Sequence, residues 1–217
     1  MSATESDLAA EHGLDELPWH LTGNFGPVEH ELDVAPLEVE GKIPSELDGM
    51  YVRNGFNPVN GWSDHWFFGT GMLHAVDLRE GRARYRNRYV RTPYFESGGE
   101  AMSFDPVVSP ANTHVVRHAG RILALEEVHS AWEVDDELAT VGPVDWDGGV
   151  VGAFTAHPKL CPITGEMLAF GYNAVGPEFL RYYRFSADGA LVQSCLLYTS
   201  PSPRDLIAHL VCRLLLE

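Results

Sequence analysis

The sequence has little cysteine, little positive charge and no long apolar run, and each shortage excludes a class of protein. Its three cysteines form no Cys-x-x-Cys pair, which argues against a disulfide scaffold or a zinc ribbon and is typical of reduced cytoplasmic thiols. The formal net charge of -16 repels phosphate backbones, so nucleic-acid binding is not expected. No apolar run reaches the roughly 18 residues of a membrane-spanning helix, and the acidic N-terminus is no secretory signal. We therefore expect a cytoplasmic protein.

The acidic charge is concentrated at the start of the chain. Residues 1–40 contain ten Asp or Glu and no Lys or Arg. Residues 1–20 are polar with little periodicity, and we interpret them as an acidic, partly disordered leader; a docking tail is the alternative. In either case anionic lipid would repel this segment, so it is not expected to anchor the protein to a membrane.

Between residues 41 and 193, short β-rich runs alternate with tight-turn signals. Hairpins are predicted at Gly81, Gly120, Gly165 and Gly189, where a turn favours positive φ. Because no long stretch has the apolar spacing of a helix, the pattern favours an antiparallel sandwich, barrel or propeller over a parallel α/β sheet. The first three glycines are 39 and 45 residues apart, which matches the roughly 40–50 residues of a four-stranded propeller blade.

One strand is also predicted over residues 50–53, closed by a turn at Asn54-Gly55.

The end of the chain departs from the alternation of β-rich runs and turn signals. All 21 glycines lie at or before Gly189, and residues 195–205 resemble a translated sequencing-adapter read-through. We therefore expect residues 195–217 to be a non-native tail and the native protein to continue past about residue 194; a genuine C-terminal helix is the alternative.

No compact catalytic or metal-binding motif is present. The ten histidines form neither HExxH nor HxH, and the chain has no GxSxG, P-loop or Rossmann glycine motif. A metal site would have to collect its ligands from distant strands.

Three sequence blocks nevertheless carry a family resemblance. They are residues 47–58 (LDGMYVRNGFNP), 65–74 (HWFFGTGMLH) and 155–159 (TAHPK). Residues 112–116 (NTHVV), followed by 119–121 (AGR), add a fourth piece in the same order. Together they resemble the N-terminal part of the carotenoid cleavage oxygenases, a family that includes the retinal pigment epithelium isomerase and stilbene-cleaving dioxygenases. The resemblance covers about residues 20–194.

This resemblance implies a fold and a metal site. The family fold is an all-β, seven-bladed propeller in which four histidines from different blades hold one Fe(II) on the axis. Residues 21–194 would be the N-terminal blades of an incomplete propeller. The resemblance places the first iron ligand at His157 and suggests Glu127 as its hydrogen-bonding carboxylate, with the adjacent Glu126 as the alternative. The other three ligands would lie downstream of this chain, because the setting of His209 does not resemble the family's second ligand.

The chemistry of His157 agrees with this assignment. Pro158 biases the residue before it to extended geometry, and a neutral imidazole suits Fe(II). A metal-bound ring usually donates its other N–H to a carboxylate or carbonyl, a role open to Glu127. Without the resemblance, a strand-end histidine bonded to backbone would be the simpler interpretation.

Neighbouring residues are interpreted as structural. His74 is expected to pack on a strand, and His114 to be structural or exposed. Thr70 stands where the family usually has Asp, which puts the hydrogen bonding of its turn in doubt. The following aromatic residues are expected in the core rather than in a substrate tunnel: Trp66, Phe67, Phe68, Tyr182, Tyr183 and Phe185.

The resemblance also implies an activity. The complete protein would be a non-haem Fe(II) dioxygenase that uses O2 to cleave a C=C bond of a carotenoid, apocarotenoid or stilbene-like substrate, with peripheral membrane contact for an apolar substrate. We expect the present chain to be inactive alone, because it carries one of the four ligands. The alternative is a non-catalytic β-propeller binding module. The sequence does not indicate the oligomeric state.

Overall fold

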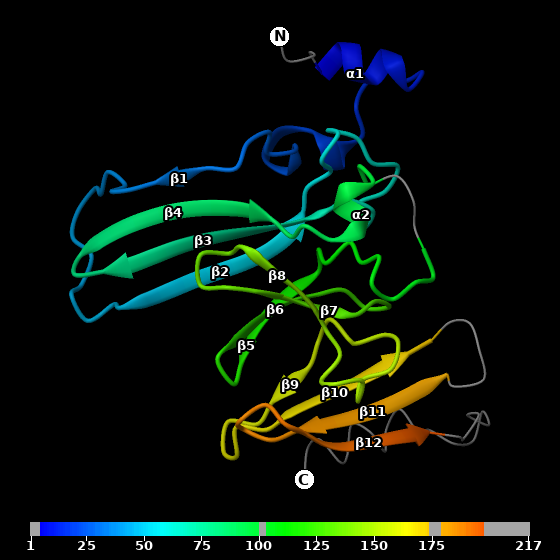
Figure 1. Ribbon diagram of the computed structural model, residues 1–217. Helices are drawn as coiled ribbons and strands as arrows, with labels where there is room; N and C mark the ends of the chain where they lie inside the picture. The colour runs from blue at the N-terminus through cyan, green and yellow to red at the C-terminus, as the bar shows by residue number, and fades with distance from the viewer. Residues whose placement is uncertain (1–4, 100–102, 174–178, 198–217) are drawn as a thin grey trace, which may run out of the picture.

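The computed structural model describes residues 5–99, 103–173 and 179–197, which form three four-stranded antiparallel sheets (Figure 1). The first sheet contains, in spatial order, β1 (Asp33–Val34), β4 (Arg82–Tyr89), β3 (Gly71–Arg79) and β2 (Gly49–Phe56). The second contains β5 (His114–His118), β6 (Arg121–Leu125), β7 (Ala131–Val134) and β8 (Thr140–Val144). The third contains β12 (Leu191–Leu197), β11 (Leu180–Phe185), β10 (Met167–Tyr172) and β9 (Lys159–Leu160).

Helical structure is short in the described residues. It comprises α1 (Glu5–Glu11), α2 (Pro93–Glu96) and two 3-10 turns (Trp19–Leu21 and Gly23–Phe25). None of these helices is long and apolar enough to cross a membrane. The prediction of an all-β fold is therefore confirmed for the described residues, although the short helix α2 intervenes between β4 and β5.

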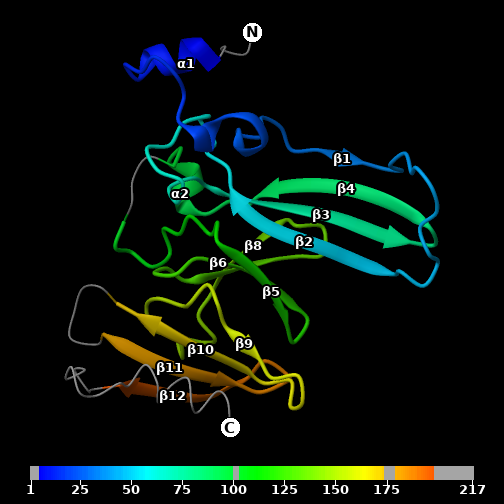
Figure 2. The ribbon, with the colours of Figure 1, turned by 180° about the vertical axis from the view of Figure 1, so that it is seen from behind.

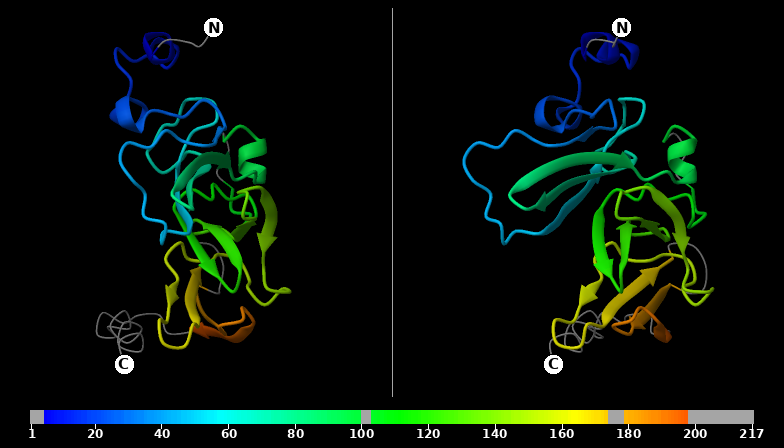
Figure 3. Two further views of the ribbon diagram at one scale, coloured as in Figure 1. Left: turned by 90° about the vertical axis from the view of Figure 1, so that its left-hand side faces the viewer. Right: turned by 60° about the vertical axis from the view of Figure 1, so that its left-hand side comes forward.

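The three sheets follow one another in chain order and enclose two separate cores (Figure 3). Strand β6 contributes to both, because successive side chains of a strand point to opposite faces. Ile122 and Ala124 pack toward the first sheet, whereas Leu123 and Leu125 pack toward the third. The middle sheet is therefore buried on both faces, as expected for an internal propeller blade.

The predicted hairpins are confirmed. The loops between β3 and β4 and between β5 and β6 are the pairs Glu80-Gly81 and Ala119-Gly120, and all four residues have positive φ, from 49° to 81°. This geometry matches the right-handed twist of the flanking strands. Glycine supplies it without the steric cost that a Cβ imposes.

The predicted turn at Asn54-Gly55 is wrong, because β2 continues through both residues to Phe56. The Asn54 amide donates from Nδ2 to the carbonyl oxygens of Ala111 (2.7 Å) and His114 (2.9 Å), which ties the first sheet to the second. A Cβ added at the nearby Gly71 would overlap the Ala111 carbonyl. These contacts between blades override the local turn preference of the Asn-Gly pair.

Regular structure is present in part of the predicted leader and in the first residues of the predicted tail. Within the predicted leader, α1 buries Ala9, and the His12 ring stacks on Trp62 with centroids 3.6 Å apart. At the other end, β12 extends to Leu197, three residues into the predicted tail, and Cys195 pairs with Tyr182. Residues 198–217 lie outside the described residues, so the origin of the tail stays a prediction.

Candidate metal-ligand site

The candidate site lies where the edge strands of the second and third sheets meet. Strand β5 begins at His114, Glu127 follows the end of β6, and His157 precedes β9 by two residues. Because β5 and β6 are antiparallel, the beginning of one lies beside the end of the other. Strands β5 and β9 lie close to each other in two opposite views of the molecule (Figures 1 and 2). All three side chains therefore reach the same end of the two blades.

The two site residues predicted from the resemblance are in contact. Nε2 of His157 lies 3.1 Å from Oε1 of Glu127. The His157 side chain is 59% exposed and that of Glu127 is 30% exposed. Nδ1 of His157 forms no hydrogen bond within the described ranges. The imidazole thus has one nitrogen directed at a carboxylate and the other accessible.

The neighbouring carboxylate, Glu126, is engaged elsewhere. Its Oε2 accepts hydrogen bonds from His129 Nδ1 (2.5 Å) and from the Val128 amide (3.0 Å). Burial alone would lower the pKa of His129, but the hydrogen bond and negative charge of Glu126 outweigh it and raise this pKa. Of the two adjacent acids, the structure pairs Glu127 with His157 and Glu126 with His129.

A second histidine, which the sequence interpretation left as structural or exposed, lies beside His157. The rings of His114 and His157 are 5.9 Å apart, with an interplanar angle of 35°. Burial lowers the pKa of His114, and the positive charges of His157 and Lys159 lower it further. The two histidines are 43 residues apart, which is one blade length, and each stands at the start of an edge strand. That interval is the sequence signal that could have revealed their proximity.

The described residues contain no group of three or more His, Cys, Asp or Glu side chains placed to hold a metal ion. The cluster therefore supplies one suitable imidazole with a bonded carboxylate, and not a complete ligand set.

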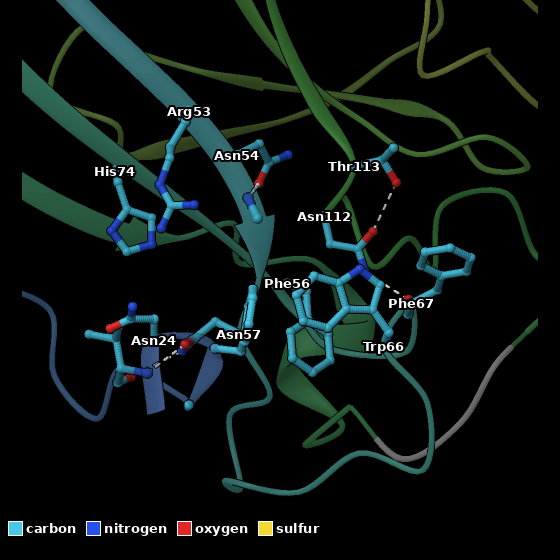
Figure 4. A pocket seen from close by; sticks show the side chains of 14 residues that line it. Asn24, Arg53, Asn54, Phe56, Asn57, Trp66, Phe67, His74, Asn112 and Thr113 are labelled. Atoms are coloured by element: carbon cyan, nitrogen blue, oxygen red, sulfur yellow. Dashed lines mark hydrogen bonds between the residues drawn. The ribbon is translucent and has the colours of Figure 1, made fainter. Parts of the chain in front are cut away.

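A cavity of about 320 Å³ lies nearby at the end of the first sheet (Figure 4). Phe56 and Trp66 stack in its wall with centroids 5.5 Å apart. Arg53 and His74, paired across β2 and β3, lie side by side in the same view. The Asn112 side chain contributes to the lining and donates from Nδ2 to the Gly69 carbonyl (2.6 Å). The cavity therefore combines aromatic walls with a few polar groups, as small-molecule sites commonly do.

Several structural interpretations from the sequence can be compared with the structure. Tyr183 and Phe185 are fully buried, as expected. Phe67 and Phe68 are 68% and 44% exposed, so placing them in the core was wrong; they lie in the segment between β2 and β3. Thr70 is buried and donates from Oγ1 to the Asn57 carbonyl (2.5 Å), and its own carbonyl accepts from the Asn57 amide (2.7 Å), so the threonine is hydrogen-bonded at this turn without the aspartate.

His74 gives a testable pH dependence. Its Nδ1 lies 2.8 Å from the Tyr85 hydroxyl, and burial, followed by the positive charge of Arg53, lowers the pKa of His74 to about 4. The unfolded chain binds this proton near pH 6.5, so the stabilisation from the neutral ring is present above that pH and lost as the pH falls toward 4. After discounting for solvent screening, we expect a loss of about 1 kcal/mol between pH 7 and pH 5. Urea unfolding measures it.

The control for this prediction is His74→Gln, which removes the titration but keeps a polar partner for Tyr85. Between pH 7 and pH 5, the difference between the unfolding free energies of wild type and variant should change by the same amount of about 1 kcal/mol. An identical pH dependence in the variant would contradict the assignment.

Comparisons with known proteins agree with the predicted family. The model of the family described as retinal pigment epithelial membrane protein matches residues 25–207. A carotenoid cleavage oxygenase from Mycobacterium tuberculosis is 42% identical over 196 residues, which cover 85% of this chain and 39% of the relative. The family match ends inside the segment predicted to be non-native.

Two solved structures show the same arrangement of sheets. The lignostilbene dioxygenase of Pseudomonas brassicacearum matches with a TM-score of 0.70 and 33% identity, over 81% of this chain and 41% of that one. A cobalt-substituted apocarotenoid oxygenase from Synechocystis matches with a TM-score of 0.66 and 23% identity, over 78% and 42% of the two chains.

These structures have the β-propeller fold, which confirms the prediction of an incomplete propeller for the described blades. The chain spans about two fifths of the length of the relatives it matches. On the family match and the identity to its relatives, the chain belongs to the carotenoid cleavage oxygenases.

Proposed function

We propose that the complete protein is a non-haem Fe(II) dioxygenase that uses O2 to cleave a C=C bond of a carotenoid, apocarotenoid or stilbene-like substrate. The names of its relatives support both substrate classes, because one is a carotenoid cleavage oxygenase and another a lignostilbene dioxygenase. The observation that carries the proposal is the accessible imidazole of His157 held against Glu127. The present chain would contribute the first blades and one iron ligand.

The donor chemistry at His157 suits this metal. Neutral imidazole is a usual ligand of Fe(II), and ligating histidines usually donate the second ring N–H to a carboxylate. The 3.1 Å contact with Glu127 matches that arrangement, and it would leave Nδ1 for the metal. When bound, iron would supply the site that binds and activates O2.

The chain's own residues would prepare this ligand and balance its charge. Four neutral imidazoles leave the full charge of the metal uncompensated, and Glu127 supplies a negative charge 3.1 Å from the His157 ring. A fixed ring also loses little conformational freedom when it binds. We expect the 217-residue chain alone to be inactive, because the described residues hold no group of three metal-ligating side chains.

An apolar substrate determines where the enzyme would have to take it up. Carotenoids partition into membranes, so we propose peripheral membrane contact for substrate uptake by an otherwise cytoplasmic protein. The net charge of -16 implies that this contact would be apolar rather than electrostatic.

A second candidate is a non-catalytic β-propeller binding module that keeps the scaffold without the metal. The incomplete ligand set among the described residues is compatible with this candidate as well as with the enzyme. The complete reading frame distinguishes the two proposals, because the enzyme needs three further histidines in later blades and the binding module does not.

The proposal is tested by sequencing the locus past codon 194 and purifying the complete protein with Fe(II). A panel of polyenes and stilbenes is then incubated with it, and products are identified by mass spectrometry under ¹⁸O2. We expect two carbonyl products with incorporated ¹⁸O from at least one substrate, and none from the 217-residue chain. A complete protein with full iron content that cleaves no member of the panel would contradict the proposal.

A further inference from the structure

Glu127 is held in place by the same short segment that carries His157. Its Oε2 accepts hydrogen bonds from the Thr155 hydroxyl and from the Ala156 amide, each 3.2 Å long. Its Oε1 is thereby left facing His157 Nε2 at 3.1 Å. A carboxylate fixed at one oxygen by two donors cannot rotate freely, so the direction of the other oxygen is set.

The direction of the Thr155 hydroxyl proton is also determined. The His157 amide donates to Thr155 Oγ1 (3.0 Å), which occupies an acceptor position on that oxygen. The hydroxyl proton then points to its other partner, Oε2 of Glu127. This gives a chain of hydrogen bonds from the His157 amide through Thr155 to Glu127, whose other oxygen lies 3.1 Å from Nε2 of the His157 ring.

This chain of hydrogen bonds is attached to the rigid part of the third sheet. Thr155 is fully buried, and its own amide donates to the Phe170 carbonyl of β10 (2.8 Å). Ala156 is fully buried as well. Glu127, by contrast, lies beyond the end of β6 in a segment without regular structure. Thr155 and Ala156, anchored at the third sheet, therefore fix Glu127, which follows the end of β6 in the second sheet. These hydrogen bonds join the two blades at the site.

We propose that Thr155 is a positioning residue: its hydroxyl holds Glu127 so that the carboxylate fixes the tautomer and direction of the His157 ring. The importance of this positioning for iron binding rests on the proposed function, in which the His157 ring is an iron ligand. The positioning itself does not depend on metal. A ring held with its proton on Nε2 presents the lone pair of Nδ1.

The test compares Thr155→Val, which removes the hydroxyl at nearly constant shape, with Thr155→Ser, which keeps it. Long-range ¹H–¹⁵N NMR of the metal-free 217-residue chain, at a pH where the ring is neutral, reports the tautomer of His157. A charge-assisted hydrogen bond should give the wild type at least about a tenfold preference for the Nε2–H form. We expect Thr155→Val to fall to the ratio of a histidine free in solution, and Thr155→Ser to keep the wild-type ratio.

A merely structural threonine would give a different result. Loss of thermal stability in Thr155→Val with an unchanged tautomer ratio would overturn the proposal, as would equal changes in the valine and serine variants. If Thr155→Val does not fold, Thr155→Ala provides the same loss of the hydroxyl with less crowding. Far-UV circular dichroism checks the fold of each variant before the comparison.

A second measurement separates this inference from the proposed function. In the complete protein, Thr155→Val should weaken iron binding by about 10- to 100-fold, the usual effect of losing a group that orients a ligand, and Thr155→Ser should not. A complete protein that binds no iron, with the tautomer shift still present, would refute the metal function and keep the positioning role. Unchanged iron affinity in the valine variant, together with an unchanged tautomer ratio, would refute the positioning role and leave the metal function standing.

Discussion

Replacing His157 with alanine is expected to lower kcat/KM of the complete protein for C=C cleavage by at least about a thousandfold. The reason is that the proposed iron site would keep three of its four ligands, and the open position would admit water. Glu127 would also lose its partner at 3.1 Å and place an uncompensated carboxylate beside the metal. Steady-state kinetics on the best substrate, with iron content measured for each preparation, provides the test.

The control is His30→Ala, because the His30 side chain is 79% exposed and far in the sequence from the site. It removes one imidazole without changing the proposed ligand set, and activity should stay within about twofold of wild type. If both variants lose activity equally, the effect is one of folding. If neither does, His157 is not a ligand.

Replacing Arg86 with methionine is expected to destabilise the protein by about 3 kcal/mol, the largest stability effect we predict. The Arg86 side chain is only 2% exposed and lies between the first two sheets. Its guanidinium contacts Asp77 Oδ2 of β3 (3.0 Å), Glu137 Oε2 (2.5 Å) and the Asp136 carbonyl (2.7 Å). Without it, the partly buried Asp77 would lose its counter-ion, and the link between the blades would be lost. Urea unfolding of both proteins measures the difference.

Arg84→Met is the matched control, two residues away on the same strand. Arg84 also pairs with acids, Asp33 at 2.6 Å and Glu137 at 3.1 Å, but its side chain is 34% exposed. Because an exposed pair contributes little to stability, we expect a clearly smaller loss from Arg84→Met than from Arg86→Met. Equal losses in the two variants would contradict the claim that burial makes Arg86 the stronger link. Adding Asp77→Leu to Arg86→Met should restore part of the lost stability.

The elements that could be predicted from the sequence are those specified locally. Gly81 and Gly120 mark two-residue hairpins because only a few residue types tolerate positive φ at both turn positions. In contrast, β7 and β8 were not predicted. Gly142 and Pro143 weaken the strand signal of β8, which is an edge strand and tolerates proline there. Trp132 and Val134 of β7 are buried only once the first two sheets pack together.

The residues of the candidate site also divide into those that the sequence indicates and those that depend on packing between blades. The sequence indicates His157 and Glu127 only through the family resemblance, because no compact motif joins residues 30 positions apart. The proximity of His114 and the role of Thr155 depend on how two blades meet. His114 reaches His157 because the edge strands β5 and β9 are adjacent, and Thr155 reaches Glu127 across the same boundary. The sequence signal for the first contact is the interval of one blade length between the two histidines, and the second has no local signal.

The most direct test of iron ligation by His157 is an anomalous-difference map at the iron absorption edge, from crystals of the complete protein. The account predicts a single peak at bonding distance from a ring nitrogen of His157, with Glu127 hydrogen-bonded to the other nitrogen. A map without such a peak, or a peak beside a His157 ring turned away into solvent, would contradict it.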